Sequence, residues 1–160
     1  SQVLNRMRIV YTVGEWGWAK AVVEHGDQRR KMRVSYLTNA PLDMIEAAIA
    51  VLGGAKLTEF SFEEEPSTHE WRIEAGETAG DILIRVHWFE DDFPKQDGKT
   101  GTEVFRCQTT RRAFAEAVRG CLRVVLQKHG MKDYKRRWLH ERFPIKELKE
   151  LERLLALPIE

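Results

Sequence analysis

The sequence predicts an α+β fold in which a mainly antiparallel β-sheet carries helices on one face or at one end. Most of the first 108 residues fall into short segments that alternate apolar and polar side chains, as half-buried strands do. Turn signals such as His25-Gly26-Asp27 separate neighbouring segments by a few residues, which indicates antiparallel pairing. Apolar residues recur at helical spacing in the middle of the chain and near its C-terminus. Strands and helices segregated in this way are typical of the α+β class.

Seven strands are expected from the limits of the alternating segments. In the third, Met32, Val34 and Tyr36 share a face, while Trp71 and Trp88 lie on apolar faces of later strands as candidate core residues. The expected strands cover residues 7–13, 16–24, 32–37, 57–64, 69–75, 82–89 and 103–108.

The first expected helix follows Asn39, which can cap it, and holds Pro41 in its first turn, where a missing N–H costs little. Gly53-Gly54 ends the helix because glycine readily adopts a left-handed conformation. Its apolar stripe consists of Leu42, Ile45, Ile49 and Leu52.

Helices also close the chain. A longer helix begins after Thr109 or Thr110 and ends at Gly130, and a short helix with Tyr134 and Trp138 one turn apart follows. Pro144 opens the last helix, whose narrow stripe fits packing on its own domain or pairing with a second copy, so monomer and homodimer both stay open. The two stripes are Phe114, Val118, Cys121, Leu122 and Val125, and then Ile145, Leu148, Leu151 and Leu155.

Length and composition narrow the class of protein. A chain of 160 residues predicts a single domain, 1–160, and 42% hydrophobic with 32% charged residues is a soluble globular balance. The longest apolar runs are too short to span a bilayer, and Ser1 to Arg8 lacks the apolar core of a secretory signal. Two cysteines make no disulfide framework, so we expect free thiols and a cytoplasmic protein.

Motifs of common catalytic sites are mostly absent from the sequence. It contains no glycine-rich phosphate loop, no His-Glu-x-x-His helix and no Cys-x-x-Cys pair, and its histidines lack metal-site spacing, so we expect no metal and no cofactor. No serine has a nucleophile-elbow context, and Cys121 lies on a helical apolar stripe. His87 beside Arg85 on one strand face is the remaining acid–base candidate, which would make the chain a small hydrolase or nuclease.

Charge is distributed unevenly along the chain. Residues 56–103 hold 13 acidic and 5 basic side chains, whereas residues 106–142 hold 3 acidic and 11 basic ones. The two blocks either neutralise each other in the fold or form an acidic face and a basic face. An acidic face would bind a protein partner, such as the basic cleft of a nuclease, through Glu59, Glu63, Glu64, Glu90, Asp91 and Asp92.

Two tryptophans and the basic block give further candidates. Trp16 and Trp18 have the same parity across Gly17, so both rings point the same way, into the core or into an exposed patch that marks a protein interface. Basic residues interleaved with Tyr134 and Trp138 suit phosphate contact and base stacking, although a net charge of +1 is low for a dedicated nucleic-acid binder. The nucleic-acid candidates in segment 111–142 are Arg111, Arg112, Lys135, Arg136 and Arg137.

A resemblance favours a protein partner. It is carried by Ser35-Tyr36-Leu37 before the first helix, Glu65-Pro66 followed by Trp71, and Tyr134-x-x-x-Trp138 with Phe143-Pro144. With these motifs the chain resembles small bacterial α+β proteins, some of them similar to the immunity proteins of contact-dependent growth inhibition and other polymorphic-toxin systems. The resemblance implies a cytosolic, non-enzymatic protein that binds and neutralises one cognate toxin, often a nuclease, and it transfers no catalytic residue.

Overall fold

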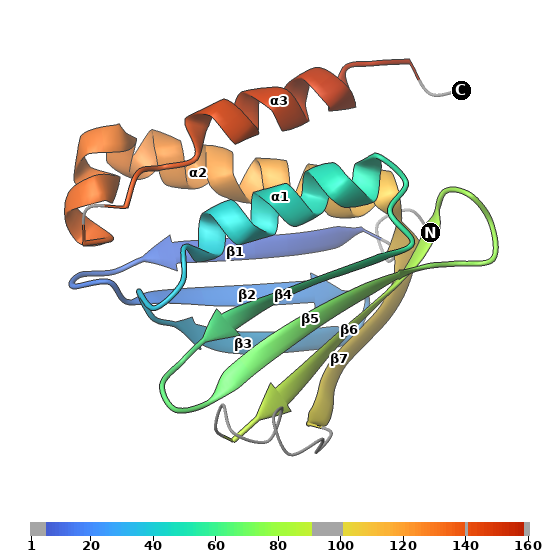
Figure 1. The fold of residues 1–160 in the computed structure, drawn as a ribbon, viewed down its shortest axis with the longest axis horizontal. Coiled ribbons are helices and arrows are strands. Elements are labelled where there is room, and N and C mark those ends of the chain that lie inside the picture. Colours follow the sequence, from blue (N-terminus) through green and yellow to red (C-terminus); the bar gives the residue numbers. More distant parts are fainter. Residues whose placement is uncertain (1–5, 91–100, 140, 159–160) are drawn as a thin grey trace.

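Two antiparallel sheets and three helices make up the α+β fold of the computed structural model, which describes residues 6–90, 101–139 and 141–158 (Figure 1). Sheet 1 has the order β1 (Met7–Val13), β2 (Ala19–His25), β3 (Gln28–Val34). Sheet 2 has the order β4 (Leu57–Glu63), β5 (Thr68–Ala75), β6 (Asp81–Phe89), β7 (Thr102–Thr110). The helices are α1 (Ala40–Leu52), α2 (Arg111–Arg137) and α3 (Ile145–Leu155). None of these helices is long and apolar enough to cross a membrane.

The inner faces of both sheets meet in one hydrophobic core that includes side chains from all three helices. Tyr11 on β1 joins the layers, because its ring packs edge-on against Phe62 of β4, 6.4 Å between centroids, and against Trp138 after α2, at 6.2 Å. Phe60 stacks on the fully buried Trp71 at 5.0 Å. This aromatic cluster accounts for the alternation predicted in β1, β4 and β5, because each strand turns one apolar face toward it.

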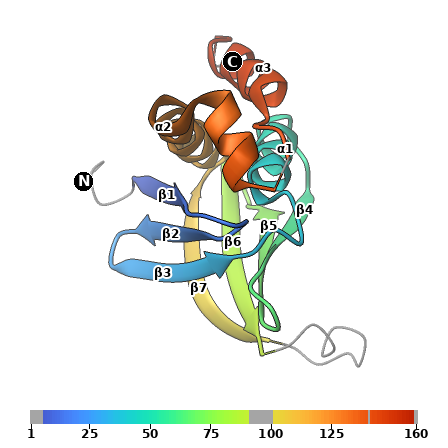
Figure 2. The same ribbon diagram turned by 90° about the vertical axis from the view of Figure 1, so that its left-hand side faces the viewer.

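The helices form a layer over one side of the two sheets (Figure 2). Helix α1 packs against α2 and β4, α2 also packs along β1, and α3 lies across α1 and α2. The buried residues of α3 are Leu148 and Leu151, so the last helix packs on its own chain. The predicted stripe of α2 is confirmed in full, since Phe114, Val118, Cys121, Leu122 and Val125 are all buried.

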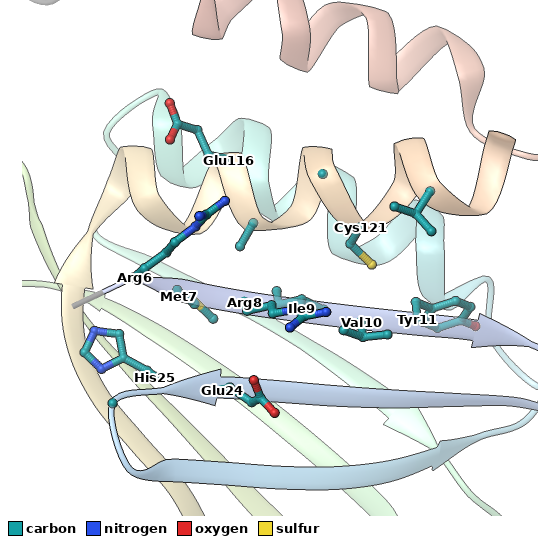
Figure 3. Close-up of a pocket in the computed structure, with 14 residues that line it drawn as sticks. Arg6, Met7, Arg8, Ile9, Val10, Tyr11, Glu24, His25, Glu116 and Cys121 are labelled. Carbon is teal, nitrogen blue, oxygen red and sulfur yellow. The ribbon is translucent and has the colours of Figure 1, made fainter. Parts of the chain in front are cut away.

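Helix α2 covers the free edge of β1, which would otherwise present unpaired backbone groups. The small residues Ala117 and Gly120 and the buried Cys121 of α2 line the gap beside the strand. The remaining gap between helix and strand is a groove of about 630 Å³, flanked by Arg6, Arg8 and Glu116 (Figure 3). The edge of sheet 1 is therefore protected by a helix.

Two sequence-based expectations about elements are corrected, and a third is confirmed. The second strand begins at Ala19, not residue 16, because Trp16 and Gly17 both have positive φ and form the β1–β2 turn. The third strand ends at Val34, so Tyr36 lies in a turn and is exposed instead of sharing the inner face. Gly130, with φ of 69°, has a non-helical backbone and divides α2 where the longer helix was expected to end, so the expected short helical segment with Tyr134 is confirmed.

Two expectations about packing faces also change. The buried face of α1 is centred on Met44, Ala48 and Val51, and the predicted Leu42, Ile49 and Leu52 are only half-buried. Small alanines on this face let α1 approach α2 closely. Trp71 is core as expected, but Trp88 on the same inner face of sheet 2 is half-buried, because it lies at the open end between the sheets.

Arg111 fastens the start of α2 to two other segments. Its guanidinium donates to the carbonyls of Val51 at 2.8 Å, Ala55 at 2.9 Å and Ala79 at 3.0 Å. Two of these carbonyls lie at or just beyond the C-terminus of α1, where a positive charge also interacts favourably with the helix dipole. Arg111 therefore has a structural role in the fold.

Replacing Arg111 with Met should lower the free energy of unfolding by about 3 kcal/mol, because charged hydrogen bonds to partly buried carbonyls are lost. Arg153→Met is the matched control, since Arg153 is exposed and, among the residues that the structure describes, bonds only to Glu150 one turn away. Urea unfolding measures both variants. Equal midpoints for the two would contradict the structural role of Arg111.

His69 is a buried histidine held in its neutral form. Its side chain is 1% exposed, and Nε2 accepts a hydrogen bond from Nε of Arg30 on β3 at 3.1 Å. Burial first, and the neighbouring Arg30 guanidinium second, lower the pKa of His69 to about 4. A histidine in the unfolded chain takes up its proton near pH 6.5.

The free energy of unfolding should fall as the pH drops from 6.5 to 4, because His69 becomes protonated in the unfolded chain but stays neutral in the native protein. A pKa difference of this size corresponds to about 3 kcal/mol at pH 4. His69→Gln should flatten the profile in this window when unfolding is followed by urea at each pH. Parallel pH profiles for the variant and the natural sequence would refute the assignment.

Candidate protein-binding site

Four large apolar side chains are exposed at one end of the molecule, and we call them the Trp16 patch. Trp16 is 78% exposed, Leu37 55%, Tyr36 47% and Leu139 39%. They come from three segments: the β1–β2 turn, the connection from β3 to α1, and the end of α2, which lie together at the left of Figure 1. An exposed cluster with an aromatic centre is the usual chemistry of a protein interface.

Gly17 holds these segments together. A Cβ at this position would lie 2.6 Å from Cβ of Tyr36 and 3.0 Å from Cδ1 of Leu139, so both side chains pack directly on the glycine. The N–H of Gly17 donates to the carbonyl of Arg137 at 2.8 Å, which ties the turn to the end of α2. Trp16 and Leu37 adjoin these contacts in the sequence, and the patch is thus built around one close approach.

The backbone of the patch is strained. Trp16 has φ of 58° and Leu139 has φ of 52°, the left-handed region that bulky side chains avoid at a cost of about 1–2 kcal/mol each. A turn with positive φ at both central residues normally carries Asn, Asp or Gly, not Trp. The fold therefore presents the Trp16 ring to solvent against the local preference of its backbone.

Charged side chains brace the patch from one side. Arg137 bonds to Glu15 at 2.9 Å and to Asp133 at 2.7 Å, and Arg136 reaches the same two carboxylates. Hydrogen bonds from His129, Arg136 and Arg137 hold the pKa of Asp133 well below its usual range. The network fixes the β1–β2 turn against the end of α2 and stays charged at all physiological pH values.

Trp16 and Trp18 differ in their surroundings. Trp18 is half-buried, and the guanidinium of Arg33 lies 4.9 Å from its ring centroid in a cation–π contact. The expectation that both rings point the same way came from reading residues 16–18 as a strand, and the positive φ of Trp16 and Gly17 removes that alternation. Trp16 alone of the two is prominently exposed.

The acidic candidates that the structure describes lie on or beside the strands of sheet 2. Glu63, Glu64 and Glu90 fall at one end of the sheet, where Thr68 donates to Glu63 at 2.7 Å and Ser67 to Glu64 at 3.0 Å. Glu59 lies further along β4, 3.8 Å from Arg72. Asp91 and Asp92 are outside the described residues. Arginines interleave with the acidic side chains on the outer face of this sheet, so the face has mixed charge.

The basic candidates on α2 are occupied in holding the fold. Arg111 caps α1, Arg112 pairs with Glu116 at 3.3 Å, and Arg136 and Arg137 belong to the network with Glu15 and Asp133. Arg119 and Arg123 bind Glu152 of α3. Lys135 is exposed. The basic block is thus neutralised in large part by carboxylates of the same chain, and its aromatic residues Tyr134 and Trp138 are buried, not offered to bases.

The structure does not place the candidate catalytic residues in an arrangement suited to catalysis among the described residues. His87 stands on the outer face of sheet 2 opposite Glu70 and Glu103, and its neighbour Arg85 is bonded to Glu74. Burial raises the pKa of both thiols, Cys107 and Cys121, to about 12, so neither is a thiolate near neutral pH. Across the described ranges, no group of three His, Cys, Asp or Glu side chains is placed to hold a metal ion.

Sequence reasoning missed Tyr36, Leu37 and Leu139 as surface residues. The strand expected over residues 32–37 places Tyr36 on its inner face, and Leu139 carries no sequence signal because its exposure follows from a left-handed backbone at the end of α2. The pair of glycines Gly14 and Gly17 around Trp16 was the available clue to a turn.

Comparison with known proteins adds one distant likeness. No protein-family model and no curated protein matches the chain. Among solved structures, it is similar to a chain of the "CdiA-CT/CdiI toxin and immunity complex from Enterobacter cloacae", with a TM-score of 0.47 and 6% identity. The likeness covers 71% of this chain and 96% of that chain, and it is too slight to carry an argument about site or partner.

Gly17→Ala should destabilise the protein by about 3 kcal/mol, because it adds a clash with Tyr36 and Leu139 to the cost of a left-handed alanine. Gly54→Ala is the control, since Gly54 also has positive φ, 96°, but nothing lies within 4 Å of its added Cβ. It should lose only about 1 kcal/mol in urea unfolding. Similar losses for both would mean that the close approach at Gly17 does not hold the patch together.

Proposed function

We propose that the chain is a protein-binding module anchored by the Trp16 patch, and that it acts as an immunity protein by binding and neutralising a bacterial toxin. The observation that carries the proposal is the convergence of Trp16, Tyr36, Leu37 and Leu139, all exposed, from three separate segments. The fold is strained where it presents two of these residues, and strain of that kind is found where a backbone serves a function.

The chemistry of the patch suits a protein partner. Tryptophan and tyrosine are over-represented among the residues that dominate binding energy, because they bury a large area and lose little side-chain entropy. The Gly17 contact and the Arg137 network hold the segments behind the patch, so little ordering remains for a partner to impose. The exposed Arg136 and Glu15 form a charged rim beside the apolar centre, as in ordinary interfaces.

The class of partner rests on the resemblance of the sequence motifs to immunity proteins. Within those motifs, Trp71, Tyr134, Trp138 and Phe143 are buried and serve the core, whereas Tyr36 and Leu37 are exposed and belong to the patch. An inhibitor of this kind needs a surface and no catalytic group. The acidic residues Glu59, Glu63, Glu64 and Glu90 of sheet 2 offer a second location for the interface, which adjoins the patch where the N–H of Ser35 donates to the carbonyl of Glu63.

The proposal is tested with the tagged chain and the protein that it retains from a bacterial extract. Expressed alone in a bacterial host, the retained protein should arrest growth, and co-expression of the chain should restore it. Trp16→Ala should weaken binding about 30-fold or more and abolish protection, because the anchor side chain is removed. Binding is measured by titration calorimetry on the purified pair.

Val124→Ala is the matched control, since Val124 is 58% exposed on α2 outside the patch and should protect as well as the natural sequence. A retained protein that does not arrest growth would contradict the immunity role. Full protection by Trp16→Ala, with protection lost in Glu63→Lys/Glu64→Lys, would move the interface to the acidic end of sheet 2.

A further inference from the structure

A cleft of about 520 Å³ opens beside β3. It lies between sheet 1 and the end of sheet 2 that is formed by the start of β5 and the end of β6. Its size falls in the range of pockets for small ligands. Lys20 of β2, Arg30, Lys31 and Arg33 of β3, and His69 and Trp88 of sheet 2 line it. We call it the β3 cleft, and it lies outside both the Trp16 patch and the basic segment of α2.

The β3 cleft has an excess of positive charge within the described part of the chain. No ion pair involves Lys20, Arg30, Lys31 or Arg33 among these residues, in contrast to the arginines of α2. The carboxylate among the lining residues is that of Glu64, so four basic side chains are set against one acidic one. Basic side chains left without acidic partners attract an anion from solvent.

His69 holds Arg30 in the wall of the cleft through a side-chain hydrogen bond. A guanidinium can only donate, so Nε2 of His69 accepts from Arg30 and the ring proton must lie on Nδ1. That Nδ1–H is buried and has no hydrogen-bond partner among the described residues. The histidine therefore positions the Arg30 guanidinium in the wall of the cleft.

Trp88 adds a flat surface to the same cleft. It pairs with His69 across the β5–β6 ladder, so both side chains emerge on the inner face of sheet 2. Its ring is half-buried where Phe62 and Trp71, on the same face, are fully buried. Partly exposed indole rings beside basic groups are the arrangement on which nucleic-acid bases stack.

We propose that the β3 cleft binds a nucleotide, with the base stacked on Trp88 and the phosphate held by Lys20, Lys31 and the arginines of β3. The shared chemistry is a phosphorylated aromatic ligand, either a free nucleotide or one unit of a single strand. The site is independent of the Trp16 patch, so an experiment that refutes one of the two proposals leaves the other standing.

Titration calorimetry with adenosine 5′-monophosphate tests the proposal directly on the full chain. Adenosine and inorganic phosphate should each bind about ten-fold or more weakly than the monophosphate, because each retains half of the contacts. Lys20→Gln/Lys31→Gln and Trp88→Leu should each weaken the monophosphate about ten-fold. Addition of the nucleotide should also shift the imidazole nitrogen signals of His69 in NMR spectra.

Two controls locate the site. Lys132→Gln/Lys135→Gln removes two exposed charges of α2, and Trp16→Ala removes the anchor of the proposed protein interface; neither should change nucleotide affinity. A single-stranded oligothymidine that binds more tightly than the monophosphate, with the same sensitivity to Lys20 and Lys31, identifies a strand as the ligand. Weaker binding of the strand identifies a free nucleotide.

Three outcomes would overturn the proposal. One is no binding of either nucleotide probe at millimolar concentration. Another is equal affinity for inorganic phosphate and the monophosphate, which would leave Trp88 without a role. The third is loss of binding in the Lys132→Gln/Lys135→Gln control, which would place the contact on α2 instead.

Discussion

The structure depends on how α2 is held along sheet 1. A three-stranded sheet with an open edge needs cover, and α2 supplies it by burying its apolar stripe against β1 and α1. Arg111 fastens the start of the helix to carbonyls at the end of α1, and the hydrogen bond from Gly17 to Arg137 fastens its end to the β1–β2 turn. Because both ends are tied, the helix also fixes where α3 packs and where the Trp16 patch stands.

The contacts that hold α2 in place also determine how charge is distributed over the surface. Most arginines of α2 face carboxylates of α2, α3 or the β1–β2 turn, so a segment that looks basic in sequence is neutralised in space. Within the described residues, an exposed apolar cluster at one end and a cleft beside β3 whose basic side chains make no ion pair stand apart from these charge pairs. Residues that the fold itself does not use are the ones offered to partners.

The sequence predicts the class and most elements, because alternation and helical spacing report directly on burial: the α2 stripe and the capping Asn39 are confirmed. Prediction from the sequence fails where a bulky residue adopts a positive φ that its side chain disfavours. The sequence pattern places Trp16 in a strand, whereas its φ of 58° places it in a turn. Nothing in the sequence indicates the positive φ of Leu139. Prediction also fails where charge pairs are made between distant segments, as for Arg137 and Glu15, because spacing along the chain says nothing about them. The β3 cleft combines residues of both sheets and was invisible for the same reason.

Amide hydrogen exchange of the chain, alone and bound to the protein it retains, tests the central claim most directly. If the Trp16 patch is the interface, the N–H groups of residues 15–18 and 36–38 should slow on binding, while those at residues 59–64 keep their free rates. Protection confined to residues 59–64 and Glu90, with the β1–β2 turn unchanged, would contradict the account and assign the interface to the acidic end of sheet 2.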